Sequence, residues 1–209
     1  MTLPYIITVA HKKGGVSKTT TACNIAVELY KKFDTTLIDL DSQKHFTVFN
    51  QKRDEPIKQK EIVDNKELKK YVKNDKGLTI IDIGGYDSEL SRMAMLLSDL
   101  IITPVGDSPF ELLGLKEFQK IVNVISERNE DIKSFVLISR IHHADKQTHK
   151  DVKKFLKKKG IFEIFDTVIT DRKIHKHILI EGKNVCEIDE SSKASKEIRS
   201  LVGEIIKKA

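Results

Sequence analysis

The 209-residue sequence has no tryptophan, only two cysteines, and no apolar run near the ~20 residues that a transmembrane helix needs. Cys23 and Cys186 supply neither a disulfide framework nor the spacing of metal ligands. A short apolar run lies within residues 1–10, but no basic segment precedes it, so no signal peptide is expected. These absences favour a cytoplasmic protein over a secreted or membrane-spanning one.

Charge is plentiful and unevenly placed along the chain. Charged residues make up 33% and hydrophobic residues 39%, a mixture typical of a globular protein. The net charge is +6, and residues 140–183, with 12 Lys+Arg against 6 Asp+Glu, carry all of it. The same segment holds five of the seven histidines. Such a local excess suits a polyanionic partner and a solvated helix face equally well.

Short apolar runs alternate with segments of helical period. Strands are predicted at residues 5–9, 35–38, 78–83, 100–105 and 135–139, and helices at 18–32, 87–98 and 110–128. Strands that are apolar at every position are usually buried on both faces, as in a parallel sheet between helices. The charged residues 51–76 are predicted to form a surface helix and loops. We therefore expect one α/β domain over residues 1–209, with a mostly parallel, twisted β-sheet flanked by helices on both faces.

A loop with the sequence HKKGGVSKTT, residues 11–20, joins the first predicted strand to the first predicted helix. In that place backbone N–H groups and a helix N-terminus can surround a phosphate. Lys18 is expected to reach the β- and γ-phosphates of a nucleotide, and the Thr19 hydroxyl to bind Mg²⁺. The ordinary G-x-x-x-x-G-K-[ST] pattern fails at both glycines, where Lys12 and Ser17 stand. A glycine turn that precedes a helix by chance is disfavoured by the strand-loop-helix context.

The loop resembles the deviant Walker A motif, [KR]-G-G-x-G-K-[ST], of the ParA/MinD family of ATPases, with Ser17 as the one departure. The resemblance implies a nucleotide-binding segment formed by Gly14, Gly15, Val16, Ser17, Lys18, Thr19 and Thr20. In that family the early lysine crosses a dimer interface to the partner's nucleotide, which implies the same role for Lys13. Serine is strained at positive φ where glycine is not, so Ser17 leaves the backbone path of the loop open.

Aspartates stand at the ends of two further apolar strands. Residues 37–43 resemble the family's D-x-D-P-Q segment, with Ser42 in place of proline. By that resemblance Asp41 positions or activates the attacking water, and Asp39 lies in the outer shell of Mg²⁺. Asp82 resembles the Walker B acid and is expected to hold a Mg²⁺-bound water. One such aspartate is weak evidence, because strand-end Asp residues often cap helices, but the set in this order supports a Mg²⁺-nucleotide site.

The resemblance extends over nearly the whole chain. Residues 98–105 and 108–111 match a family strand and loop, and residues 135–140 match a strand ending in a base-contacting turn, which implies a nucleotide contact for Arg140. Residues 168–172 and 181–183 resemble distal elements of the short plasmid-partition branch, the ParF-like proteins. The resemblance implies a nucleoid-associated ATPase of weak intrinsic turnover, with ATP/ADP and Mg²⁺ as ligands, and a homodimer formed on ATP binding. The catalytic residues that it implies are Lys13, Lys18 and Asp41.

The basic C-terminal third is the candidate DNA surface. Nonspecific DNA binding needs cations that neutralise phosphates rather than a base-reading motif. In the family, basic residues of two such regions form an ATP-dependent DNA surface, so the candidate contacts are Lys146, Arg172, Lys173 and Lys176. For residues 157–159 a solvated helix face is favoured, and the histidines lack a compelling metal-ligand geometry. The implied protein partner is a ParB-like centromere-binding protein.

The last predicted helix carries an apolar stripe flanked by lysines, formed by Ile198, Leu201, Val202, Ile205 and Ile206. A membrane-targeting helix has such a stripe, and so does a helix that covers a sheet, which is commoner. We therefore expect no stable membrane association, although a MinD-like membrane-cycling positioning ATPase remains the main alternative. A metabolic or iron-sulfur relative and an inactive binding module are less favoured, because the cysteines suit no cluster and the loop and acid residues are all present.

Overall fold

The structure is a computed structural model that describes residues 1–85, 87–142, 150, 152–155 and 162–209. A β-sheet runs through its centre in the order β3-β2-β4-β1-β5-β6-β7, with β8 paired to β6. The strands are β1 (Tyr5–Val9), β2 (Thr35–Asp39), β3 (Lys58–Gln59), β4 (Leu78–Asp82), β5 (Leu100–Val105), β6 (Lys133–Ile141), β7 (Glu163–Ile164) and β8 (Ile169–Thr170). All strand pairs among the described residues are parallel.

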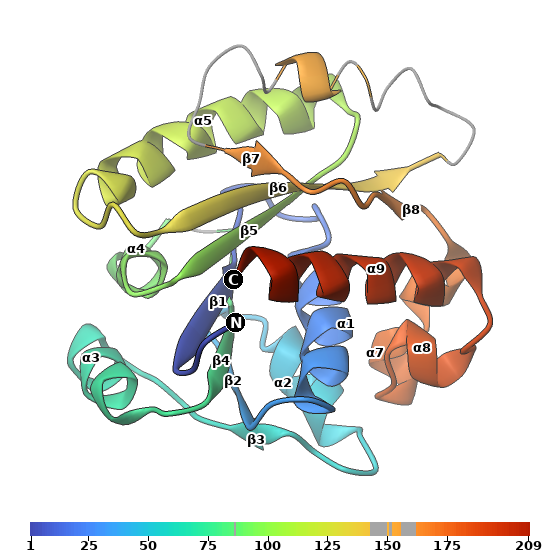
Figure 1. Cartoon of the computed structure of the whole chain (residues 1–209), viewed down its shortest axis with the longest axis horizontal. Helices are drawn as coiled ribbons and strands as arrows, with labels where there is room; N and C mark the ends of the chain where they lie inside the picture. The colour runs from blue at the N-terminus through green and yellow to red at the C-terminus, as the bar shows by residue number, and fades with distance from the viewer. Residues whose placement is uncertain (86, 143–149, 151, 156–161) are drawn as a thin grey trace.

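Helices cover both faces of this sheet (Figure 1). They are α1 (Lys18–Tyr30), α2 (His45–Gln51), α3 (Asn65–Asn74), α4 (Glu89–Leu96), α5 (Pro109–Ser126), the 3-10 helix η1 (Lys173–Lys176), α7 (Ile178–Glu181), α8 (Val185–Ile188) and α9 (Lys193–Lys208). One core lies between the sheet and α1, α2 and α7 to α9, and a second core lies between the sheet and α3 to α5. The predicted α/β fold with a mostly parallel sheet flanked by helices on both faces is therefore confirmed.

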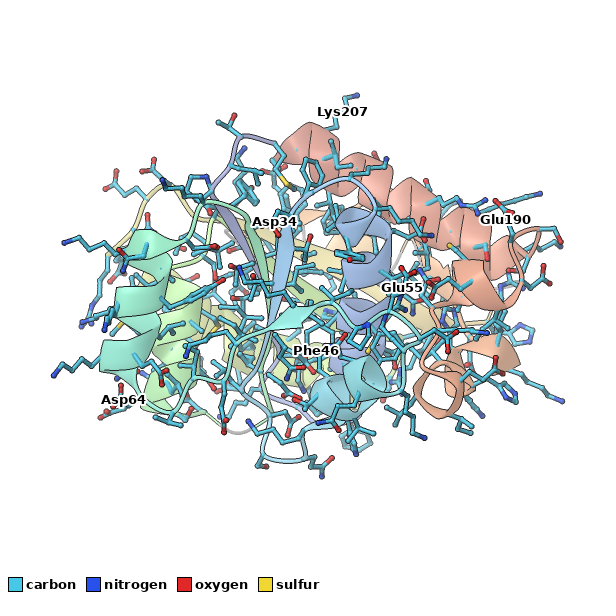
Figure 2. All side chains as sticks on the ribbon, turned by 90° about the horizontal axis from the view of Figure 1, so that it is seen from below. Asp34, Phe46, Glu55, Asp64, Glu190 and Lys207 are labelled. Atoms are coloured by element: carbon cyan, nitrogen blue, oxygen red, sulfur yellow. The ribbon has the colours of Figure 1, made fainter. Side chains whose placement is uncertain are left out.

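Alternation along each strand explains why the strands are apolar throughout. Ile7 belongs to the first core and its neighbour Ile6 to the second, and Leu37 and Ile38 divide in the same way. Successive side chains of a strand point to opposite faces, so both faces of these strands require apolar residues. Viewed from below, Phe46 of α2 lies inward, whereas exposed charged residues such as Asp64 and Lys207 project at the rim (Figure 2).

Helix α9 and the segment 51–76 can each be compared with their predicted structure. The apolar stripe of α9 packs into the first core, where four of its members are buried and Ile206 is partly buried, so the sheet-covering interpretation is confirmed. The segment 51–76 contains α3, as predicted, and also the short edge strand β3, which the charge pattern did not indicate. In the described part of the chain, no helix combines the length and the apolarity needed to cross a bilayer.

Candidate functional site

Three strands end side by side at one edge of the sheet. Val9 and Asp39, the last residues of β1 and β2, both pair in register with Asp82, the last residue of β4. Parallel sheets bind ligands outside their carboxyl ends, where loops and helix N-termini converge. A pocket of about 680 Å³ opens there, lined by parts of segments 14–24, 41–45, 139–140 and 169–179. Its volume suits a ligand of nucleotide size.

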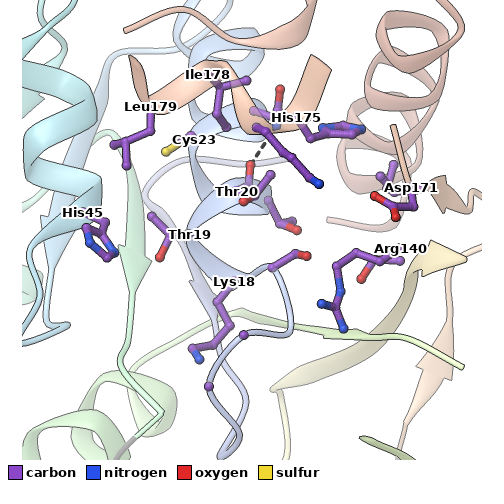
Figure 3. A pocket seen from close by; sticks show the side chains of 18 of the residues that line it. Lys18, Thr19, Thr20, Cys23, His45, Arg140, Asp171, His175, Ile178 and Leu179 are labelled. Carbon is purple, nitrogen blue, oxygen red and sulfur yellow. Dashed lines mark hydrogen bonds between the residues drawn. The ribbon is translucent and has the colours of Figure 1, made fainter. Parts of the chain in front are cut away.

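The predicted phosphate loop forms one wall of this pocket. Lys18, Thr19 and Thr20 enter from the start of α1, and Arg140 faces them from the end of β6 (Figure 3). Gly15 and Ser17 both adopt left-handed backbone conformations, with φ of 75° and 71°. The Ser17 side chain makes no capping hydrogen bond to α1. Serine therefore takes up the conformation that the related motif assigns to glycine.

The two lysines of the loop differ in their surroundings. Lys18 is buried, its Nζ donates to the Lys13 carbonyl oxygen at 3.1 Å, and burial lowers its pKa against the opposing charges of Asp82 and Asp41. The Lys13 side chain runs along α5, because a Cβ placed on Gly114 would lie 3.8 Å from Lys13 Cβ and Cδ. Lys13 is not among the described residues that line the pocket. Lys18 thus faces the acids at the strand ends, while Lys13 lies outside them.

Val16 and His11 are buried side chains of the loop. The Val16 side chain is buried and does not line the pocket within the described residues. His11 is buried, stacks on Phe118 with ring centroids 5.5 Å apart, and accepts the Lys13 N–H at its Nδ1 (2.8 Å). Burial, with the charges of Lys18 and Lys13, lowers the pKa of His11 to about 4. The neutral ring therefore acts as an acceptor that holds the backbone of Lys13.

Asp82 and Thr19 form the centre of the polar site. Thr19 Oγ1 donates to Asp82 Oδ2 at 2.6 Å, and Asp82 Oδ1 is buried with no hydrogen-bond partner among the described residues. Burial raises the pKa of Asp82 to about 8; the Thr19 hydrogen bond and the Lys18 charge oppose this rise, while the Asp39 and Asp41 charges add to it. A buried carboxylate with an unused oxygen is well suited to an added cation.

The two aspartates at the end of β2 make different contacts. Asp39 Oδ2 accepts hydrogen bonds from the backbone N–H and the hydroxyl of Thr47 (2.8 and 2.9 Å), and Oδ1 accepts the Asp41 N–H (3.0 Å). Asp39 therefore fastens the loop that leads into α2. Asp41 lines the pocket, and its Oδ1 lies 3.4 Å from the position of a Cβ on Gly84. Asp41 is thus the strand-end acid next to the loop that follows β4.

The predicted DNA contacts fall at the far side of the pocket. Lys173 and Lys176 are exposed on η1, and Lys176 also lines the pocket. Arg172 is half-buried, pairs with Glu197 at 2.8 Å and lines the pocket. Lys146 lies outside the described residues. Arg172 and Lys176 therefore border the pocket, with Arg172 already bound to an acid, while Lys173 is not among its lining residues.

One pocket residue, His175, and one residue that contacts the pocket residue Arg140, Glu111, had no role assigned from the sequence. His175 is half-buried, lines the pocket, and has no hydrogen-bond partner at either ring nitrogen among the described residues. Glu111 is buried and forms an ion pair with Arg140. Ser108 and Glu111 have the spacing of a capping box, a local pattern that gives no sign of a contact with Arg140.

Comparison with known proteins identifies relatives over almost the whole chain. A family model described as the CobQ/CobB/MinD/ParA nucleotide-binding domain matches residues 7–185. The maintenance of carboxysome distribution protein A of Halothiobacillus neapolitanus is 21% identical, over 97% of this chain and 96% of its own length.

Solved structures share the fold. A plasmid partition protein of Borrelia burgdorferi B31 bound to AMPPNP has a TM-score of 0.75 and 22% identity, covering 99% of this chain and 100% of that one. The cell division protein MinD of Aquifex aeolicus has a TM-score of 0.77 and 16% identity, with 98% of each chain covered. At such identities the structural similarity establishes the fold.

Proposed function

The chain belongs to the CobQ/CobB/MinD/ParA family of nucleotide-binding domains, and we propose that it is an ATP hydrolase that partitions DNA. The observation that carries the proposal is the division of labour between the two loop lysines. Lys18 faces the strand-end acids inside the pocket, and Lys13 lies outside it along α5. This arrangement suits a dimer in which Lys18 binds its own nucleotide and Lys13 reaches the partner's. The AMPPNP-bound partition protein with the same fold supports ATP as the ligand.

Thr19 is proposed to bind Mg²⁺ and Asp82 to hold a Mg²⁺-bound water, with Asp39 in the outer shell. Support comes from the unpartnered, buried Asp82 Oδ1 beside the Thr19 hydroxyl, both hard oxygen donors. In the described ranges, no group of three or more His, Cys, Asp or Glu residues is placed to hold a metal by itself. Nucleotide phosphates and water must therefore complete its shell. When bound, Mg²⁺ neutralises charge that develops on the transferred phosphoryl group.

Lys18 and Asp41 are proposed to act on the γ-phosphate and the attacking water. Backbone N–H groups of residues 14–19 surround the phosphates at the N-terminus of α1, and Lys18 contributes a buried cation. Asp41 lies at the pocket wall, where its carboxylate orients a water for in-line attack and accepts its proton. Arg140 and Thr20 complete the nucleotide contacts from opposite sides of the pocket.

The homodimer is supported by an apolar patch next to Lys13. Phe110 and Leu113, which are 75% and 59% exposed, stand on α5 beside Gly114, along which Lys13 runs. In a two-fold dimer each subunit presents the same surface patch. If Lys13 crosses the interface, residues next to it are buried in the same interface, which explains two large exposed apolar side chains. We therefore place this patch, Phe110 and Leu113, in the ATP-dependent dimer contact.

Nonspecific DNA is the proposed binding partner of the ATP-bound dimer. The exposed Lys173 and Lys176 stand on η1, and Lys176 lines the nucleotide pocket, so nucleotide-dependent dimer closure can bring two such clusters together. Arg172 and Lys146 remain proposed DNA contacts, with Arg172 able to exchange its Glu197 partner for phosphate. The closed dimer holds nonspecific DNA through phosphate contacts. A ParB-like centromere-binding protein then stimulates the weak hydrolysis and releases the dimer from the nucleoid.

The decisive experiment measures the ATPase rate with and without nonspecific DNA. It also measures retention of the chain on that DNA with and without ATP. We expect retention only with ATP, and loss of retention with a reduced salt slope in Lys173→Glu/Lys176→Glu. Lys69→Glu/Lys70→Glu, which changes two exposed lysines of α3 on the other sheet face, is the matched control. A chain that is indifferent to DNA, or an η1 variant that behaves like the control, would contradict the DNA proposal.

A MinD-like membrane-cycling positioning ATPase is the second candidate, favoured by the similarity of fold to MinD. Membrane cycling requires an amphipathic helix that is free to reach a bilayer. The apolar stripe of α9 is instead buried in the first core, which favours the DNA proposal. Flotation with anionic liposomes in the presence of ATP separates the two candidates, because only a membrane-cycling protein rises with the vesicles.

A further inference from the structure

Arg140 has an unusual backbone conformation at the end of β6. Its φ is 56°, in the left-handed region that L residues with a Cβ rarely adopt. The pairing of β6 with β8 shifts register between Ser139 and Ile141, so Arg140 lies at a bulge. Such conformations persist where the surrounding structure holds them, and they cluster at ligand sites. Here the bulge residue lines the nucleotide pocket (Figure 3).

Glu111 is the residue that holds Arg140. Its Oε1 accepts a hydrogen bond from an Arg140 guanidinium nitrogen, and its Oε2 accepts the Gly106 N–H at 2.6 Å. The Glu111 side chain is 8% exposed and that of Arg140 is 40% exposed. The carboxylate is therefore engaged at both oxygens and removed from water, whereas the guanidinium extends from it into the open pocket.

The role of Glu111 is not the local one that its sequence indicates. Ser108 is the N-cap of α5 and Glu111 stands three residues later, the spacing of a capping box, yet Ser108 makes no side-chain cap hydrogen bond. The carboxylate turns instead toward Gly106 and Arg140. A Cβ on Gly106 would lie 2.8 Å from Glu111 Oε2, so a side chain at this position would displace the carboxylate from its present place.

We infer that Glu111 is a positioning residue that orients the Arg140 guanidinium toward the bound nucleotide. The inference rests on the proposed function, which supplies the nucleotide. A guanidinium carries five N–H donors, and the one given to Glu111 fixes the plane from which the others face the pocket. Without the carboxylate, Arg140 keeps its charge but gains rotational freedom, so binding pays an ordering cost. Nucleotide affinity should then fall, while turnover of bound ATP changes little.

The test is a double-mutant cycle on nucleotide affinity. Glu111→Gln keeps one oxygen for the Gly106 N–H and replaces the oxygen that accepts from Arg140 with an NH2 group, which removes both the charge and the acceptor. ATP Kd and turnover at saturating ATP are measured for this variant, for Arg140→Gln and for the double variant, below all their melting temperatures. Glu117→Gln, at an exposed, ion-paired glutamate on the same helix, is the matched control.

We expect Glu111→Gln and Arg140→Gln each to weaken ATP binding about tenfold, the size of one charge-assisted hydrogen bond. The double variant should bind ATP no more weakly than Arg140→Gln, and the Glu117→Gln control should bind ATP as the wild-type chain does. If Glu111→Gln does not fold, the double variant is compared with Arg140→Gln alone, because the double variant lacks the buried Glu111 charge. The ATP Kd of these two variants is again expected to be equal.

Three outcomes would overturn the inference. An unchanged Kd with a lower melting temperature would make the pair a purely structural tie. A double variant that binds ATP much more weakly than Arg140→Gln would mean that Glu111 acts by another route. A wild-type chain that binds no ATP would overturn the proposed function and the inference together, whereas the first two outcomes leave the proposed function intact.

Discussion

Ser17 offers the most direct test of the loop geometry. It has a φ of 71° at the N-cap of α1, makes no side-chain cap hydrogen bond there, and stands where the related motif has glycine. Ser17→Gly therefore removes backbone strain without removing a hydrogen bond between this side chain and α1. We expect the variant to be more stable than the wild-type chain, against the usual destabilising effect of introducing glycine.

The magnitude follows from two opposing terms. Relief of a left-handed conformation is worth about 1–2 kcal/mol for a residue with a Cβ. The greater freedom of glycine in the unfolded chain costs about 0.4–1 kcal/mol. The midpoints leave a net gain of about 0.8 kcal/mol, or a rise in Tm of about 2–3 °C for a chain of this size.

Two glycines of the same loop provide a matched pair. A Cβ on Gly14 or on Gly15 would meet nothing within 4 Å, but only Gly15 has a positive φ, 75°. Gly14→Ala should therefore stabilise the chain by about 0.4–1 kcal/mol through the unfolded state. Gly15→Ala should lower the free energy of unfolding by about 0.8 kcal/mol, because the strain of alanine at positive φ outweighs the gain from the unfolded state.

Thermal and urea unfolding of the nucleotide-free chain measure these changes. Ser42→Gly, at an exposed loop position outside the positive-φ set, is the control that should lose stability. The reasoning fails if Ser17→Gly loses stability like Ser42→Gly. It also fails if Gly14→Ala and Gly15→Ala shift Tm in the same direction, because then φ does not decide the outcome.

Three further predictions concern pH, turnover and assembly. Burial, followed by neighbouring lysine charges, lowers the pKa of His11 from 6.5 to about 4. Between these values only the unfolded chain takes up the proton, so the Tm of the wild-type chain should fall on acidification from about pH 6.5 to pH 4. The Tm of His11→Asn should fall less steeply, and equal slopes of Tm against pH would refute the prediction. Asp41→Ala should bind ATP and accumulate as an ATP-bound dimer in size-exclusion chromatography, and normal hydrolysis would remove Asp41 from its role. Phe110→Ser/Leu113→Ser should remain monomeric with ATP while binding the nucleotide, whereas the exposed-apolar control Val63→Ser should dimerise normally.

The phosphate loop and the strand-end aspartates could be predicted from the sequence because local patterns specify them. An apolar strand, a Gly-Gly-x-x-Lys-Thr loop and a helical period predict a strand-loop-helix unit without knowledge of the rest of the chain. The aspartates Asp39 and Asp82 follow apolar strands, and parallel strands end at one edge, so their meeting was predictable too. The strands and helices that were predicted agreed, with differences of a residue or two at their ends, whereas α2, β3, β7, β8, η1, α7 and α8 were not predicted.

Side-chain partners that come from different elements and do not stand at strand ends could not be predicted from the sequence. The carboxylate of Glu111 meets Arg140 only after β5 and β6 pair, and a Ser-x-x-Glu pattern points to a cap instead. Arg172 resembles a free surface cation until α9 brings Glu197 against it. Likewise His11 becomes a neutral acceptor only when α5 buries it beneath Phe118.

By itself, then, the sequence determined the strand-loop-helix start, the order of the acids and the α/β class, because periodicity and short motifs act over a few residues. The tertiary structure decided which polar groups pair with one another and which remain available to a ligand. Burial and partner choice depend on packing between distant segments. For this reason the same loop that signalled a nucleotide in the sequence shows only in three dimensions that Lys18 faces inward and Lys13 lies outside the pocket.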